Sequence, residues 1–258
     1  MRFASLGSGS AGNALVVEVK QTRLMLDCGF SVKETTSRLA RLNLTPNDIT
    51  GIVITHEHDD HAGGALKLAA KYRIPVWLTY GTLKMVTRYM PVNQYDLQLN
   101  VMDSHTAVAI ADIEVQPYPV PHDAREPIQC IFTEGNLKLG VLTDVGRGTP
   151  HIEDQLNGCN ALMLECNHDA NMLQNGPYGW TLKKRVGGDL GHLENLDAAN
   201  LLSKLDNSKL QHIMAAHLSA KNNTPLLAKS ALAKVLGCEL DWVGVADQLQ
   251  GFNWREVV

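Results

Sequence analysis

The chain has 258 residues, of which 45% are hydrophobic, and a formal net charge of -4 at pH 7. This size and apolar content, with no long low-complexity stretch and no evident internal repeat, favour one compact domain over residues 1–258 and no separate cap domain. The mildly acidic charge argues against non-specific binding of duplex DNA through a basic surface.

The N-terminus and the cysteines predict where the protein is located. The N-terminus leads directly into a predicted strand, without a basic segment and a long apolar core, and no stretch approaches about 18 uninterrupted apolar residues. The five cysteines, an odd number at scattered positions, match neither a disulfide framework nor a zinc ribbon. We expect buried thiols, a cytoplasmic protein and no membrane partner.

Apolar runs and apolar alternation predict strands that alternate with helices along the chain. The predicted strands are 2–6, 14–19, 23–27, 51–54, 75–79, 106–110, 113–120, 128–133, 137–143, 160–165, 210–216 and 241–246. The predicted helices are 33–42, 63–72, 150–157, 195–206 and 226–236. This order places most of the polar motifs directly after strands.

The segment after the predicted strand 51–54 contains three histidines and three acids within six residues, 56–61. In an extended segment His56 and His58 point the same way and can reach one cation, while Asp60 and His61 lie past the turn and can face a second. The alternative is a solvated polar loop before a helix, with Asp60 as its cap. The density of histidines favours metal binding.

Other predicted strands also end in an aspartate or a histidine. These residues are Asp27, His122, Asp144 and His217. Alone, each is more often a turn former or a cap. Two metals need about seven or eight ligands in total, so together with the 56–61 segment these residues indicate a site built on one edge of a sheet.

In this order, the motifs resemble the five motifs of the metallo-β-lactamase superfamily, and the resemblance covers the whole chain. It implies an α/β (α+β) fold, a four-layer αβ/βα sandwich with two mixed sheets face to face, helices outside, and a dinuclear site at one edge. The implied ligands are His56, His58 and His122 for the first metal, Asp60, His61 and His217 for the second, and Asp144 between them. Asp27 is expected to accept a hydrogen bond beside these ligands and to orient them.

Two divalent metal ions are therefore expected, zinc or manganese, with iron possible for such mixed ligands. A cysteine in place of the bridging acid would have suggested an antibiotic-cleaving enzyme, so Asp144 points away from β-lactams. A carboxylate bridge between two cations suits hydroxide generation and in-line displacement at phosphorus.

The glycine- and serine-rich stretch 7–13 lies between the first two predicted strands. Such a loop lets backbone N–H groups and hydroxyls approach an anion, although an ordinary hairpin connection has the same pattern. The stretch resembles the opening of the YycJ-like (WalJ-like) branch, whose members are regarded as 5′-to-3′ exonucleases or related phosphodiesterases acting on DNA. We expect Ser8, Ser10 and Asn13 to contact substrate.

Segments 164–173, 176–178, 182–185 and 191–193, and Asn222 with Asn223, also resemble that branch, although Glu194 departs from its pattern. His192 lies about 25 residues before His217, the spacing at which related phosphodiesterases place a histidine that contacts the scissile phosphate. We expect it to be the general acid. The alternative is a histidine that caps the helix after Glu194.

Two further features stay open at this point. His168 follows a predicted buried strand and either binds substrate or is a satisfied interfacial histidine. The basic run 183–185 is either the solvated face of a helix or a contact to a nucleic-acid strand.

We therefore expect a dinuclear metal hydrolase that cleaves DNA ends or single strands. A hydroxide between the metals would attack phosphorus, Asp60 and Asp144 would keep the cations oriented, and His192 would protonate the leaving oxygen. A thioesterase of the glyoxalase II type or a lactonase would share every ligand, and a non-catalytic metal-stabilised binding module is a further alternative. The oligomeric state is not specified by these patterns.

Overall fold

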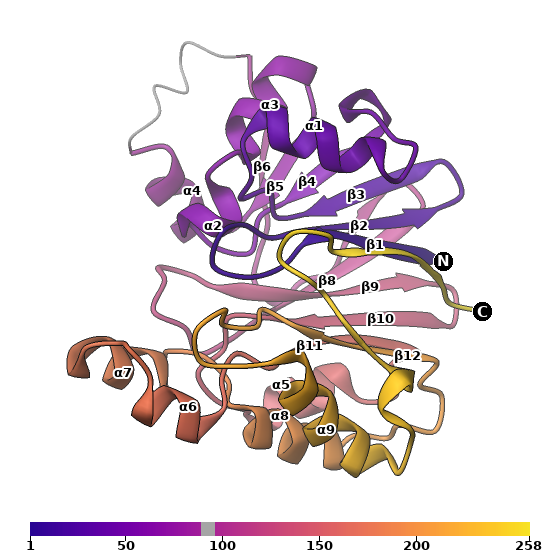
Figure 1. Cartoon of the computed structure of the whole chain (residues 1–258). Coiled ribbons are helices and arrows are strands. Elements are labelled where there is room, and N and C mark those ends of the chain that lie inside the picture. Colours follow the sequence, from indigo (N-terminus) through magenta and orange to yellow (C-terminus); the bar gives the residue numbers. More distant parts are fainter. Residues whose placement is uncertain (89–95) are drawn as a thin grey trace.

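The computed structural model describes residues 1–88 and 96–258, and its strands form two seven-stranded sheets that face each other (Figure 1). In order, the first sheet contains β14 (Phe252–Glu256), β1 (Arg2–Gly7), β2 (Ala14–Val19), β3 (Thr22–Leu26), β4 (Gly51–Val53), β5 (Val76–Leu78) and β6 (Leu99–Val101). The second contains β13 (Val243–Val245), β12 (His212–Ala216), β11 (Ala161–Glu165), β10 (Leu137–Leu142), β9 (Ile128–Glu134), β8 (Ile113–Pro119) and β7 (Val108–Ile110).

Side-chain alternation along the strands produces the layers. In β2, Val17 belongs to the core between the two sheets, while Val16 belongs to the core between the first sheet and its helices. Val141 of β10 and Leu142 divide in the same way between the central core and the outer core of the second sheet. Strands buried on both faces read as continuous apolar runs, which is why the sequence shows them clearly.

Helices cover the outer face of each sheet (Figure 1). Helices α1 (Val32–Ala40) and α3 (Ala65–Tyr72) pack on the first sheet, and α5 (Pro150–Leu156), α8 (Asn195–Ser203) and α9 (Pro225–Leu236) pack on the second. The predicted four-layer sandwich of the α/β class is confirmed. The part of the chain that the structure describes also contains four short α-helices: α2 (Asp59–Ala62), α4 (Tyr80–Val86), α6 (Ala170–Asn175) and α7 (Trp180–Val186).

The strand directions bring the polar strand ends together. Strands β3, β4 and β5 run parallel in the first sheet, and β10, β11 and β12 run parallel in the second. Because the carboxyl ends of parallel strands meet at one edge, the residues after them converge. Strand β8 has the same direction as β10, since both are antiparallel to β9.

The structure differs from the sequence prediction mainly in short elements. Strands β6 and β14 and helices α2, α4, α6 and α7 were not predicted, and β14 is a five-residue strand that pairs with β1 from the far end of the chain. The five cysteines are free and four of them are buried, as predicted. Among the described residues, no helix has the length and apolar character needed to cross a membrane.

Candidate metal centre

The histidine-rich segment begins directly after β4 and continues into α2. The Asp27 carboxylate accepts hydrogen bonds from the Thr55 backbone N–H at 2.8 Å and from the Thr55 hydroxyl, which fixes the start of the segment. His58 is the N-cap residue of α2, so the chain turns there and His61 lies on the short helix. The segment thus presents its imidazoles on two sides of one turn.

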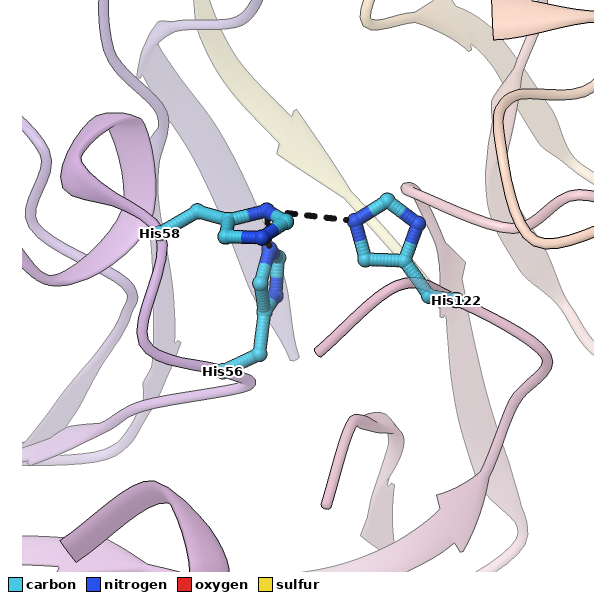
Figure 2. Close-up of side chains that lie close together, drawn as sticks. All are labelled: His56, His58 and His122. Carbon is cyan, nitrogen blue, oxygen red and sulfur yellow. Dashed lines mark hydrogen bonds between the residues drawn. The ribbon is translucent and has the colours of Figure 1, made fainter. Parts of the chain in front are cut away.

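Three imidazoles meet at the first position, as Figure 2 shows. His58 Nδ1 lies 3.1 Å from His56 Nε2 and 3.3 Å from His122 Nε2. The other ring nitrogen of His122 donates to the Gly191 carbonyl at 3.1 Å, so its Nε2 carries a lone pair. A single Nδ1–H of His58 cannot donate to both His56 Nε2 and His122 Nε2. Converging imidazole lone pairs of this kind fit a divalent cation.

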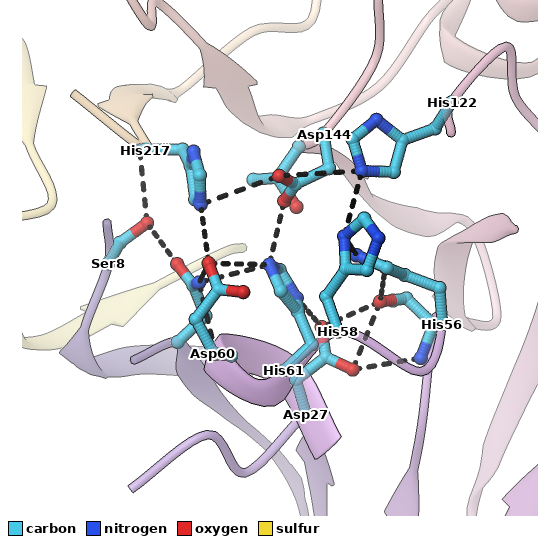
Figure 3. A network of polar contacts seen from close by, with 12 residues as sticks. Ser8, Asp27, His56, His58, Asp60, His61, His122, Asp144 and His217 are labelled. Carbon is cyan, nitrogen blue, oxygen red and sulfur yellow. Dashed lines mark hydrogen bonds and ion pairs between the residues drawn. The ribbon is translucent and has the colours of Figure 1, made fainter. Parts of the chain in front are cut away.

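A second group of donors lies beside the first (Figure 3). His61 Nε2 lies 2.8 Å from Asp144 Oδ2, and His217 Nε2 lies 3.4 Å from Asp60 Oδ2 and 3.5 Å from Asp144 Oδ1. Asp60, His61 and His217 form one set whose donor atoms lie within 4.8 Å of one another. Asp144 contacts this set and also lies 4.0 Å from His122 Nε2 of the first.

Asp144 provides the clearest test of whether the residues fit metal ions. The residue is buried, its ion-pair partners are all histidines, and its Oδ2 atom lies 2.8 Å from His61 Nε2. Because His61 Nδ1 donates to Asp27, the Nε2 of a neutral His61 turns a lone pair toward this oxygen, and two facing acceptors are costly unless a proton or a metal ion lies between them. The donor set of imidazoles and carboxylates therefore fits divalent metal ions.

The electrostatics point the same way. Burial raises the pKa of Asp144, but the charges of His217 and His61 outweigh it and hold that pKa well below its ordinary value. Burial lowers the pKa of His217, yet the carboxylates of Asp144, Asp60 and Glu165 raise it to about 10. The carboxylates thus attract positive charge to this point, and protons and metal ions compete for it.

Three residues of the site have a backbone conformation that is rare for residues other than glycine. Asp27, Asp144 and His217 have φ of 60°, 50° and 54°. Asp27 and His217 directly follow β3 and β12, and Asp144 lies two residues after the end of β10. Such positive φ values cost energy and persist where the surroundings impose them, often at functional sites. Asp27 Oδ2 also accepts from His61 Nδ1 at 2.7 Å, which orients that imidazole.

Glu165 is a site residue that the sequence analysis missed. This buried side chain at the end of β11 lies 2.8 Å from His192 Nδ1 and 3.5 Å from His217 Nδ1 through Oε1. Its Oε2 accepts from the backbone N–H groups of Val145 and Leu193. Two signals were available: Glu165 ends a continuous apolar strand, and it lies in the segment 164–173 that carries part of the resemblance. Glu165 therefore fixes two imidazoles at once.

His192 lies within the site and does not cap α8, whose N-cap residue is Glu194. Its ring stacks on that of His217, with centroids 5.3 Å apart and planes at 16°. Burial lowers the pKa of His192, but the charge and hydrogen bond of Glu165 outweigh it and raise that pKa. The structure thus removes the capping alternative, and the catalytic role stays a proposal.

The glycine- and serine-rich loop divides between two roles. Ser8 is buried, accepts from the His217 backbone N–H at 3.0 Å and contacts Asn13 Oδ1 at 3.1 Å. Asn13 is also buried, and its Nδ2 contacts Asp60 O and His61 Nε2. The side chains of Ser8 and Asn13 thus support residues of the donor groups, and substrate contact by them stays a prediction. Only Ser10 reaches the cleft.

The donor groups open into a cleft of about 340 Å³. Its far wall is α7 with the preceding Tyr178, and Arg185 of α7 donates to Asp123 Oδ2 at 2.6 Å. Asp123 Oδ1 lies 3.5 Å from His122 Nε2, so this ion pair holds α7 beside the first imidazole group. Within the basic run 183–185, Arg185 faces the cleft, whereas Lys183 lines a neighbouring cavity.

His168 lies outside both donor groups. It is buried, its Nδ1 has no hydrogen-bond partner, and it lines the same neighbouring cavity as Lys183. Burial lowers its pKa, which favours the neutral imidazole. The alternative prediction, an interfacial histidine whose polar atoms are hydrogen-bonded, is therefore wrong, because Nδ1 has no partner. Asn223, by contrast, is bonded to the Cys166 carbonyl and to Asn195, which is a supporting contact.

Comparison with known proteins agrees with this geometry. Residues 22–213 match the family described as the beta-lactamase superfamily domain. The chain is 37% identical over 239 residues to the exodeoxyribonuclease YycJ of Bacillus anthracis, covering 92% of this chain and 89% of that protein. It is 32% identical over 236 residues to the exodeoxyribonuclease WalJ of Streptococcus pneumoniae, covering 91% and 88%.

Solved structures resemble the fold along its whole length. Zinc-bound PqqB from Methylobacterium extorquens superposes with a TM-score of 0.76 at 15% identity, covering 99% of this chain and 100% of that one. The short form of human tRNase Z superposes with a TM-score of 0.70 at 15% identity, covering all of both chains. At such identities the similarity shows the fold alone.

Proposed function

The chain belongs to the metallo-β-lactamase superfamily, in the branch of YycJ and WalJ, and on this premise we propose that it is a metal-dependent phosphodiesterase that degrades DNA from the 5′ end. The single observation that carries the chemistry is the convergence of imidazole and carboxylate donors around the buried carboxylate of Asp144. The exodeoxyribonuclease names of YycJ and WalJ support DNA as the substrate.

Two divalent cations, zinc or manganese with iron as a further candidate, are proposed for this site. His56, His58 and His122 would hold one, Asp60, His61 and His217 the other, and Asp144 would contact both. When bound, such a pair lowers the pKa of water to about 7 and offsets the charge that develops on a phosphate. Zinc binding by PqqB, which shares the fold, supports metal binding only in general terms.

The protein's own residues position the reacting groups. Asp60 and Asp144 set the spacing of the ligands, and Asp27 keeps the His61 ring in one orientation. In the protonated imidazole of His192, Glu165 accepts the Nδ1–H, so the Nε2–H is the one that is donated to the departing sugar oxygen. Stacking on His217 keeps that ring beside the metal ligands.

A nucleic-acid substrate is compatible with the net charge of -4. Two bound cations contribute about four positive charges before the ligand carboxylates are counted. The metal centre would therefore attract a phosphate without a basic patch, and Arg185 and Ser10 line the same cleft. A cytoplasmic location remains part of this proposal.

A substrate panel tests the proposed function. Purified protein with added manganese or zinc should hydrolyse bis-p-nitrophenyl phosphate and shorten a 5′-phosphorylated, 3′-labelled oligonucleotide. S-lactoylglutathione and an acyl-homoserine lactone represent the thioesterase and lactonase activities that would use the same ligands. Turnover of only this second pair would reject the phosphodiesterase, and turnover of none would favour a binding module.

A further inference from the structure

A second cavity of about 600 Å³ lies on the other side of α7 from the metal cleft. His192 lines both the cleft and the cavity. Helical spacing separates the two sides of α7: Leu182 and Arg185 face the cleft, while Trp180 and Lys183 face the cavity. The cavity therefore borders the cleft at His192, the residue proposed to protonate the leaving group.

The walls of the cavity combine an aromatic surface with polar groups. Trp180 is 75% exposed, and the Lys184 ammonium lies 5.4 Å from its ring centroid. His168 adds a buried Nδ1 that has no hydrogen-bond partner, and Glu194 and Asp197 add carboxylates. A volume of this size is in the range of sites for small molecules, about 300–1,000 Å³.

A nucleobase matches these walls better than a phosphate does. Bases stack on exposed aromatic side chains, and their ring nitrogens and amino groups pair with an imidazole or a carboxylate. Two carboxylates would repel a phosphate, and Lys183 already donates to the Gln174 carbonyl at 2.7 Å. The phosphate would instead remain in the cleft beside the metal ligands.

We propose that this cavity holds the unpaired base of the 5′-terminal nucleotide, stacked on Trp180, while its 3′ phosphodiester is hydrolysed. The inference rests on the proposed function. The oxygen of water forms the new bond to phosphorus, and the P–O3′ bond breaks with its electron pair on O3′. His192 gives its proton to O3′, and the proton released by water leaves to solvent. The departing nucleotide therefore lies on the His192 side, where the cavity is.

Two substrates and three variants test this assignment. The substrates are 5′-phosphorylated single-stranded oligonucleotides with either a normal or an abasic 5′-terminal nucleotide. The variants are Trp180→Ala, Trp180→Phe, and Trp242→Ala as a control at a 41% exposed tryptophan away from both cavities. Binding is measured separately by anisotropy with non-hydrolysable phosphorothioate versions of the same strands.

For the wild type, loss of the terminal base should lower kcat/KM and affinity roughly tenfold, the scale of one base–aromatic stack. Relative to the wild type, Trp180→Ala should lower kcat/KM and affinity for the normal strand by the same roughly tenfold factor. It should leave both values for the abasic strand unchanged. Trp180→Phe should retain most of the wild-type preference for the normal strand over the abasic strand, and Trp242→Ala should retain all of it.

The outcomes separate the two claims. Cleavage by the wild type without base dependence, or a Trp180→Ala loss that is equal on both strands, overturns the cavity assignment. Absence of cleavage by the wild type overturns the proposed function. In that case base-dependent binding that is lost in Trp180→Ala still supports the cavity as a base site, and base-independent binding rejects it.

Discussion

The buried carboxylate of Glu165 accepts a hydrogen bond from His192 Nδ1 at 2.8 Å, which fixes the orientation of that imidazole at the edge of the metal cleft. The same oxygen lies 3.5 Å from His217 Nδ1, so one strand end orients a proposed metal ligand and a proposed proton donor. Proton donation by His192 and metal binding by His217 would therefore both depend on Glu165, which orients these imidazoles without contacting substrate.

Glu165→Gln should therefore reduce turnover of DNA about 10- to 100-fold, the usual cost of removing such an orienting partner. The loss should be smaller with bis-p-nitrophenyl phosphate, whose leaving group needs no proton. The comparison of kcat on both substrates is the measurement, with the exposed Glu114→Gln as the control. An equal loss on the two substrates would indicate a purely structural role for Glu165.

His192→Ala should slow DNA hydrolysis roughly 100- to 10,000-fold, the range expected for removing a general acid. The metal content should stay at the wild-type value, because His192 is not among the proposed ligands. Single-turnover rates and elemental analysis measure the two effects, with the exposed His105→Ala as the control. Wild-type turnover in His192→Ala would rule out its role as proton donor.

Removal of metal by a chelator should abolish hydrolysis and lower the melting temperature by several degrees. Ions that bind only the folded chain at 1,000 times their Kd stabilise it by about 4 kcal/mol. Calorimetry before and after chelation, followed by readdition of manganese or zinc, measures both effects. A melting temperature and an activity that chelation leaves unchanged would argue against metal at this site.

Glu18 offers a test of the fold remote from the metal centre. Burial raises its pKa, but hydrogen bonds from Arg2 and Arg23, at 2.5 and 2.6 Å, outweigh it and lower that pKa below 4.5. A lowered folded-state pKa stabilises the protein above the unfolded value and loses that effect as pH falls through the folded value. Glu18→Gln should cost no more than about 1 kcal/mol at pH 7.

The difference between Glu18→Gln and the wild type should shrink as pH falls through the lowered folded-state pKa of Glu18, because the wild-type carboxyl is then protonated too. Denaturant unfolding at pH 7 and at low pH measures it. A destabilisation that stays constant down to low pH would assign the effect to packing instead of charge.

The sequence predicted the sandwich and the convergence of polar strand ends because these depend on local patterns. Apolar runs that end in Asp27, Asp144 or His217 identify strand ends, and parallel strands bring such ends together. The short helices α6 and α7 escaped prediction since each has only six or seven residues, and glycine and proline separate them.

Contacts between distant segments could not be predicted. The pattern of the loop predicts a substrate contact for Ser8, and it gives no sign that the Ser8 hydroxyl accepts from the backbone N–H of His217, 209 residues away. The role of Glu165 likewise depends on how β11 lies between β10 and β12. Both side chains are polar groups that folding buries against the ligands, and only the three-dimensional arrangement shows which partners they meet.

The most direct test of the account is anomalous diffraction from crystals grown with manganese. We predict two peaks about 3.5–4 Å apart, one among His56, His58 and His122 and the other among Asp60, His61 and His217, with the Asp144 carboxylate between them. A map with no manganese peak among these side chains would contradict the dinuclear centre, and the proposed hydrolysis with it.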